Sequence, residues 1–251
     1  MNTELTPPAP VLATADSSGA PRRTTGYQQR LNQLRAAVLG ANDGIVSVAA
    51  TVVGVAGVTT ATGPILAAGT AAVVGGAVSM ALGEYVSVSS QSDSERGKIA
   101  TAERDLATDP EAARQELAEH WQELGLTQET AEQVASELHR RDPLAARLTI
   151  AGDIDPDDIV SPWHAAIASF LAFFLGALLP MAAILLPPPD LRIPVTFIAT
   201  LIALALTGWI AAKVGDANPV RASLRVVIGG ALALGITFVI GSLLGSAGLD
   251  I

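Results

Sequence analysis

The sequence predicts an all-α membrane protein with five transmembrane helices and a cytoplasmic helical insert between the second and the third. Three observations favour this class. Half of the 251 residues are hydrophobic, and the mean hydropathy of +0.44 is high for a soluble domain. The apolar residues gather in stretches long enough to span a bilayer, which takes about 20 residues. The charges gather elsewhere, since residues 90–161 hold 17 of the 24 acidic residues.

The first two spans are predicted at about residues 34–59 and 64–89. Residues 44–83 form a run of 40 residues without a charged side chain. Near its middle, Thr59-Thr60-Ala61-Thr62-Gly63-Pro64 interrupts the apolar pattern, which favours a short turn between two antiparallel helices. Residues 1–30 are polar and rich in proline, threonine and alanine. We expect them to form a disordered tail and not a cleavable signal peptide.

Three further spans follow a polar segment. Residues 159–189 carry no formal charge when His164 is counted as neutral, and their helix opens with Ser161-Pro162, an N-cap followed by proline at the first helical position. The fourth and fifth spans are predicted at residues 193–212 and 226–249. The chain is thus divided into a tail (1–30), spans one and two (31–89), the insert (90–158) and spans three to five (159–251).

The insert is predicted to be an acidic helical domain. Its helix starts are indicated by Asp109-Pro110, by Thr127 and by Asp142-Pro143, which combine capping side chains with proline at the first turn. Apolar residues recur at helical spacing in these helices, for example at Leu117 and Trp121. Such stripes suffice for a small bundle that packs against a second copy or against the membrane domain.

The basic residues predict which ends of the spans face the cytoplasm. They gather before the first span, in the insert, and in the last connection, which holds Lys213, Arg221 and Arg225. The turn between the first two spans has none, and the connection after span three has only Arg192. Because basic connections stay in the cytoplasm, we expect the N-terminus and the insert there. With no organelle-targeting feature to read, we expect a multi-pass protein of the plasma membrane.

Several functional classes are excluded by what the sequence lacks. There is no cysteine, so no disulfide scaffold, thiolate metal site or cysteine nucleophile is available. There is no basic surface of the kind that nucleic acids require. There is also no nucleotide-binding glycine loop, which argues against an ATP-driven pump. We expect a protein that is not an enzyme and that carries no cofactor.

Two acidic residues and a methionine lie at similar depth in the first two spans. Asp43 is in span one, and Met80 stands one helical turn before Glu84 in span two. An acid at the centre of a span costs roughly 2.5–3.5 kcal/mol on insertion scales, so it usually faces a cavity or a partner. Carboxylates suit hard ions and thioethers softer ones, which predicts a site for a borderline divalent ion such as Fe²⁺. The alternatives are that both acids only cap or anchor their helices and that Met80 fills the core.

Small residues recur four apart in span two, a spacing that lets helices approach closely. Ala72 pairs in this way with Gly76, and Gly75 with Ser79 and Gly83. The pattern fits either packing within one chain or the contact between two copies, and the sequence does not separate the two.

Two long motifs resemble the vacuolar iron transporter family. They are residues 42–47 (NDGIVS) and 79–91 (SMALGEYVSVSSQ), and Ser161-Pro162-Trp163 and the order of the segments agree with that family too. The likeness covers about residues 30–248. It implies a homodimer with a pathway between its subunits, which exports Fe²⁺, and in some members Mn²⁺, from the cytosol in exchange for protons. By motif position, Asp43 and Met80 match pathway residues and Glu84 matches the family's Gly-Glu at the end of span two.

The insert resembles the family's metal-binding domain less closely. Glu103, Glu111 and Glu116 persist as candidate metal ligands, whereas the region that aligns with the third helix, residues 147–153, has neither methionine nor glutamate. The alternative for these acids is a solvated helix face. The predicted function is proton-coupled export of Fe²⁺ and/or Mn²⁺ by a homodimer in the lipid bilayer. The alternative function is a membrane-anchored metal-binding or sensing protein without transport.

Overall fold

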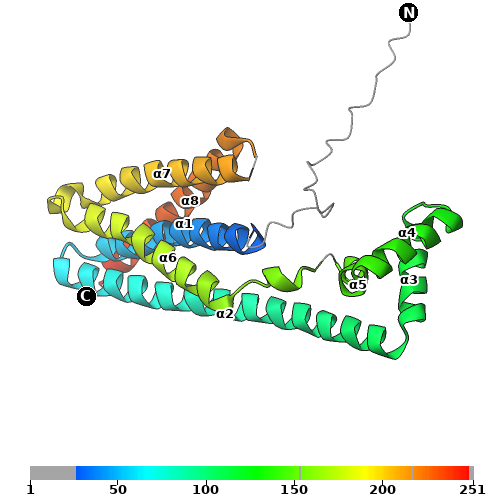
Figure 1. The fold of residues 1–251 in the computed structure, drawn as a ribbon. Helices are drawn as coiled ribbons and strands as arrows, with labels where there is room; N and C mark the ends of the chain where they lie inside the picture. The colour runs from blue at the N-terminus through cyan, green and yellow to red at the C-terminus, as the bar shows by residue number, and fades with distance from the viewer. Residues whose placement is uncertain (1–26, 153, 216, 249–251) are drawn as a thin grey trace, which may run out of the picture.

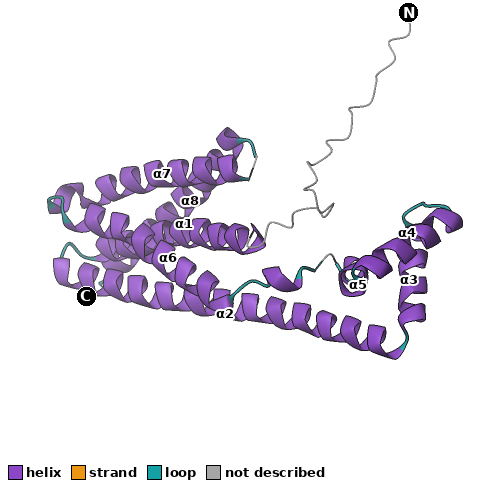
Figure 2. Cartoon of the chain, viewed as in Figure 1, coloured by secondary structure: helices purple, strands orange, loops and turns teal. Residues whose placement is uncertain are grey.

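The computed structural model describes residues 27–152, 154–215 and 217–248. These residues form eight α-helices and one 3-10 helix, with no strand among them (Figures 1 and 2). In chain order the elements are α1 (Tyr27–Val58), α2 (Thr62–Thr108), α3 (Pro110–Glu123), α4 (Gln128–Arg141), α5 (Pro143–Ile150), η1 (Pro156–Asp158), α6 (Pro162–Leu185), α7 (Pro189–Val214) and α8 (Pro219–Ser246). Of the predicted tail, residues 27–30 belong to α1, and residues 1–26 lie outside the described part.

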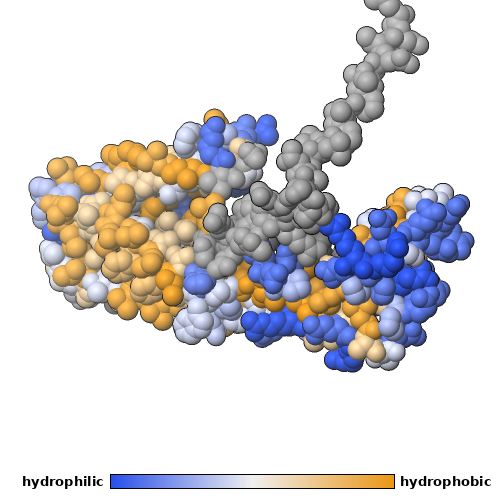
Figure 3. Space-filling view, viewed as in Figure 1, coloured by the Kyte–Doolittle hydropathy of each residue, from blue (hydrophilic) through white to orange (hydrophobic). Residues whose placement is uncertain are grey.

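Five of the described helices are long and apolar enough to cross a membrane: α1, α2, α6, α7 and α8. The short helices α3, α4 and α5 lie between the second and third of them. The predicted all-α architecture, with five candidate spans and short helices between the second and third, is therefore confirmed, whereas the cytoplasmic side of the insert and the homodimer stay predictions. Figure 3 shows hydrophobic residues over the visible face of the five-helix bundle, whereas hydrophilic residues gather on the insert.

The predicted helix starts are confirmed as well. α6 begins at Pro162, directly after Ser161. In the insert, the side chains of Asp109, Thr127 and Asp142 each accept a hydrogen bond from the backbone N–H three residues further on, at 3.0, 3.4 and 2.9 Å. These bonds satisfy amide donors that have no partner within the helix. Local capping chemistry therefore places the boundaries of these elements.

α2 passes through residue 90, the predicted boundary of the insert, without a break. Its 47 residues correspond to a length of about 70 Å at 1.5 Å per residue. Between Glu84 and Thr108 there is no proline and only one glycine, Gly97, so the sequence provides nothing that ends the helix. One continuous helix thus joins the bundle to the insert (Figure 1). The division into four domains stays a prediction about folding units.

α1 packs against each of the other four long helices. Its contact with α6 is close at two glycines. A methyl group at Gly44 would meet the backbone carbonyl of Phe173, and one at Gly176 would meet that of Ala41. Beside this contact, Val48 and Ile65 are buried with Phe173 in the main apolar core of the bundle. The position of Asp43, next to Gly44, is therefore set by backbone contact between two helices.

The insert has a small apolar core of its own. Leu117 and Ala118 of α3 are buried with Ala135 of α4 and Ala146 of α5, and Trp121 packs against them. The insert returns to the bundle beside α2, where the buried Ser92 hydroxyl donates to the carbonyl of Val160 at 2.7 Å. This hydrogen bond holds the chain before α6 against the middle of α2.

A buried arginine ties together the opposite end of the bundle. Arg192, near the start of α7, is only 8% exposed. Its guanidinium donates to the carbonyl of Thr60 at 3.1 Å, to the hydroxyl of Thr62 at 2.9 Å and to the carbonyl of Pro187 at 3.4 Å. The turn between α1 and α2 is thereby fastened to the connection between α6 and α7.

Candidate functional site

Asp43 of α1 and Met80 and Glu84 of α2 line one groove of about 350 Å³. The sequence analysis placed them at similar depth, and the packing of α1 against α2 brings them to the same cavity. The other lining residues are Leu39, Ser47, Thr51, Ala72, Gly76, Ser79, Gly83 and Phe173. The groove therefore holds two carboxylates, three hydroxyls and one thioether among apolar walls. Metal binding by these residues stays a prediction.

Asp43 is held by a hydroxyl on its own helix. The Oγ of Ser47, one turn further along α1, donates to Oδ1 of Asp43 at 2.5 Å. One turn beyond, the hydroxyl of Thr51 donates to the carbonyl of Ser47 at 2.9 Å. The bond from Ser47 occupies one of the two carboxylate oxygens, and a carboxylate offers about four acceptor positions. Asp43 is thus oriented and keeps acceptor capacity toward the groove.

Glu84 has weaker polar contacts than Asp43. Its side chain is 12% exposed. Its Oε1 atom is buried and accepts no hydrogen bond from the described residues. The nearby cation is Arg35 of α1, whose Nη2 lies 4.0 Å from that oxygen, beyond hydrogen-bonding distance. A buried acceptor without a hydrogen bond costs free energy, so a ligand that contacts this oxygen would stabilise it.

The space around Met80 depends on small neighbours. Met80 is partly buried, and its side chain packs against the apolar core that contains Phe173. A methyl group at Gly76 would collide with the ring of Phe173, so glycine at this position lets the ring lie under the groove. Met80 therefore serves the core and also presents its thioether to the cavity that the two acids line.

The small residues of α2 differ in how much space surrounds them. Ala72 and Gly76 line the groove, and so do Ser79 and Gly83. Gly75 and Gly83 would meet nothing within 4 Å if each carried a methyl group, and Ser79 is exposed. Gly76 therefore packs against Phe173 within the chain, whereas Gly75, Ser79 and Gly83 are open to a neighbouring molecule, and a contact between two copies stays a prediction.

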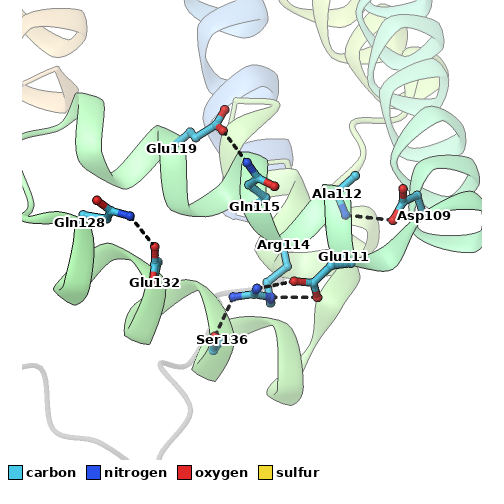
Figure 4. Close-up of polar contacts among 9 residues, drawn as sticks. All are labelled: Asp109, Glu111, Ala112, Arg114, Gln115, Glu119, Gln128, Glu132 and Ser136. Atoms are coloured by element: carbon cyan, nitrogen blue, oxygen red, sulfur yellow. Dashed lines mark hydrogen bonds and ion pairs between the residues drawn. The ribbon is translucent and has the colours of Figure 1, made fainter.

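The three glutamates of the insert do not come together. Glu103 is exposed on α2. Glu111 forms an ion pair with Arg114 on the same helix (Figure 4), and Glu116 forms one with Arg147 of α5. The hydrogen bond from Arg114 holds the pKa of Glu111 below its usual value. No group of three or more histidine or acidic side chains suited to a metal ion occurs among the described residues, and metal binding by these glutamates stays a prediction.

Sequence reasoning missed the basic partners of these acids. Arg147 also contacts Asp105 of α2 at 3.3 Å, and it occupies the region in which the sequence analysis sought third-helix ligands. Arg192 and the basic residues before the first span, which include Arg35, were used only as evidence for orientation. No local pattern indicates which acid an arginine approaches from another helix. The signal that was available is Ser47, which stands one turn after Asp43 and so shares its face.

Comparison with known proteins places the chain in a family. The family model described as the VIT family matches residues 34–242. The chain belongs to the VIT family. Vacuolar iron transporter homolog 2 of Arabidopsis thaliana is 36% identical over 227 residues, which are 90% of this chain and 91% of that protein. The vacuolar iron transporter of Acanthamoeba castellanii is 38% identical over 211 residues, or 84% of this chain and 78% of that protein.

A third VIT relative covers still more of the chain. Vacuolar iron transporter homolog 5 of Oryza sativa subsp. japonica is 34% identical over 239 residues, which are 95% of this chain and 93% of that protein. The match to the VIT family confirms the resemblance drawn from the two motifs. It also confirms the expectation that the protein is not an enzyme, since the named relatives are transporters or their homologues.

Proposed function

We propose that this VIT-family protein exports divalent metal, Fe²⁺ and/or Mn²⁺, from the cytosol in exchange for protons. The observation that carries the proposal is the groove in which Asp43 of α1 and Glu84 of α2 lie with Met80. Acids are costly in membrane-spanning segments and are retained where they face ions, cavities or partners. The names of the relatives, which call them vacuolar iron transporters or homologues, support iron as the cargo.

The ligand chemistry favours a borderline divalent ion. Carboxylate and hydroxyl oxygens from Asp43, Glu84 and Ser47 suit Mn²⁺ and similar hard ions, while the thioether of Met80 favours softer ones. A set that combines both types fits Fe²⁺ better than Mg²⁺. Because the groove holds too few protein ligands to enclose an ion, water or a second subunit completes the coordination shell.

Exchange with protons follows from the same carboxylates. A metal ion binds to deprotonated ligands, so its affinity falls when the ligands take up protons. Protonation of Asp43 and Glu84 on the far side of the membrane releases the ion and neutralises the empty site. The transporter then returns to its cytosol-facing state with a neutral site, which costs less free energy in a poorly hydrated region than a charged site would.

A homodimer completes the proposal. The outer face of α2 carries Gly75, Ser79 and Gly83 beside the groove, and the two glycines leave open space there. Small residues on a membrane helix let a second helix approach closely. A second copy seated on this face would bring its own carboxylates to the groove and place the pathway between the subunits.

The proposed orientation puts the insert and the N-terminus in the cytosol. The chain is a multi-pass membrane protein by its five candidate spans. From the sequence we predicted the plasma membrane, whereas the names of the relatives refer to the vacuole. The basic connections stay on the cytosolic side of either membrane. The proposed transport therefore runs from the same face of the protein in the plasma membrane as in a vacuolar membrane.

The alternative is a membrane-anchored metal-binding or sensing protein. Uptake of Mn²⁺ or Fe²⁺ into vesicles that hold the purified protein, with an imposed pH gradient, separates the two functions. We expect metal uptake that depends on the gradient and exceeds that of protein-free vesicles. Metal binding to the protein without any uptake would establish the alternative.

A further inference from the structure

Arg35 has a loose and incomplete contact with the groove. Its Nη2 atom lies 4.0 Å from Oε1 of Glu84, and its side chain is 66% exposed, against 12% for Glu84. The oxygen that it faces is buried and accepts no hydrogen bond from the described residues. Arg35 therefore provides opposite charge without the short, directed hydrogen bonds of a fixed ion pair.

The surroundings of Arg35 leave its side chain room to move. It lines a cavity of about 640 Å³, separate from the groove, with residues of α7 and α8 such as Gly208 and Val226. Leu39, one turn further along α1, lines both that cavity and the groove. Arg35 thus borders the larger cavity, and its largely exposed side chain approaches Glu84 at the edge of the groove.

We infer that Arg35 is a displaceable counter-cation for Glu84, which an incoming metal ion must replace, and that it thereby sets the affinity of the site for divalent metal. The inference rests on the proposed function, in which Glu84 binds the transported ion. A guanidinium stays protonated in proteins, so it competes with the metal as a cation throughout the cycle. A metal ion bound to the buried oxygen that faces Arg35 is repelled by the guanidinium at short range, so the ion binds more weakly while Arg35 stays in place.

The competition has a measurable consequence for transport. Replacing Arg35 by a neutral side chain removes the competitor and leaves the metal ligands unchanged. We expect Arg35→Gln to lower the KM for Mn²⁺ on the order of tenfold, which corresponds to about 1.4 kcal/mol of metal binding. Arg35→Lys keeps the positive charge and should retain a KM close to that of the wild type. Because Arg35 is largely exposed, neither change should disturb folding.

The experiment measures initial rates of Mn²⁺ uptake in proteoliposomes over a range of Mn²⁺ concentrations. Arg225→Gln is the matched control, since Arg225 is an exposed arginine near the start of α8, on the same basic side. Its removal changes the charge of that side without touching Glu84. Arg35→Met is a second neutral variant, and the thermal midpoint of each variant shows that it is folded.

The outcomes separate this inference from the proposed function. A lower KM in both neutral variants, with wild-type values in Arg35→Lys and Arg225→Gln, supports the counter-cation. An unchanged or higher KM in the neutral variants overturns it, and so does an equal decrease in Arg225→Gln. If wild-type vesicles take up no metal, the proposed function fails instead. If wild-type vesicles take up metal and the neutral Arg35 variants show the wild-type KM, this inference fails and the proposed function stands.

Discussion

At the scale of single residues, the two acids of the groove differ in their hydrogen bonds and in the charge beside them. Asp43 accepts a hydrogen bond from Ser47 on the same helix, so its orientation is set before any ion arrives. Glu84 has a buried oxygen without a hydrogen bond and a cation 4.0 Å away. In the proposed function, Asp43 therefore holds the ion and Glu84 exchanges cations at the site.

Glu84→Gln should uncouple metal movement from proton movement. The amide has nearly the same shape but neither binds nor releases a proton in the transport cycle. We expect a slower metal flux that carries fewer protons per ion than in the wild type. A pH-sensitive dye and a metal-sensitive dye in the same vesicles measure the ratio. An unchanged proton-to-metal ratio in this variant would show that Glu84 takes no part in the exchange.

At the scale of helices, the site depends on how closely α1 and α6 approach. Gly44 follows Asp43 directly and faces the backbone carbonyl of Phe173 without space for a methyl group. Gly176 makes the reciprocal contact with Ala41. Backbone atoms on both sides of the contact cannot turn away as a flexible side chain would. The depth and direction of Asp43 are consequently properties of this helix pair.

Gly44→Ala should therefore lower the stability of the bundle. The added methyl group overpacks a contact between two backbones, and we expect a loss of about 1–3 kcal/mol. Gly229→Ala on α8 is the matched control, since its methyl group would meet nothing within 4 Å and alanine favours the helix by about 1 kcal/mol. The thermal midpoints in detergent test this expectation. Equal midpoints for the two variants would contradict the close contact.

The insert gives a second prediction at this scale. Glu111 and Glu116 are each paired with an arginine, so a metal ion that binds there must compete with the arginines. Replacing Glu103, Glu111 and Glu116 together by alanine should reduce metal binding on the cytoplasmic side and slow transport only modestly. Equilibrium dialysis with Mn²⁺ and vesicle uptake measure the two effects. Complete loss of uptake in a folded triple variant would show that the insert feeds the pathway directly.

The elements could be predicted from the sequence because their signals are local. Apolar stretches gave the five spans, and Asp109, Thr127 and Asp142 gave the helix starts of the insert. The continuity of α2 was hidden, since a change from apolar to charged residues near Ser90 suggests a domain boundary although nothing there ends the helix. Hydropathy reports the environment of a helix and not where it stops.

Part of the candidate site could be predicted, because some of its residues also have a local signal in the sequence. Asp43, Met80 and Glu84 could be found because charge and sulfur are conspicuous in apolar spans. Arg35 lies at the start of span one among other basic residues, and only the packing of α1 on α2 brings it near Glu84. The same holds for Arg147, which meets Glu116 through the fold of the insert. Pairs between helices depend on tertiary contacts that no sequence spacing encodes.

At the scale of the whole molecule, one helix joins the groove to the insert. α2 carries Met80 and Glu84 within the bundle and extends to Asp105, which pairs with Arg147 of α5 in the insert. Arg192 fastens the turn before this helix to α7 at the opposite end. The insert and the groove therefore share α2, the helix that carries two of the proposed metal ligands.

The most direct test of the central claim is metal flux through Asp43→Ala. Purified wild-type and Asp43→Ala proteins are placed in matched vesicles with an imposed pH gradient, and Mn²⁺ uptake is followed over time. Removing a costly acid from a span should not harm insertion, so both proteins should show similar size-exclusion profiles and thermal midpoints. The account predicts that Asp43→Ala gives no uptake above that of protein-free vesicles. Uptake at the wild-type rate by the folded Asp43→Ala protein would contradict it.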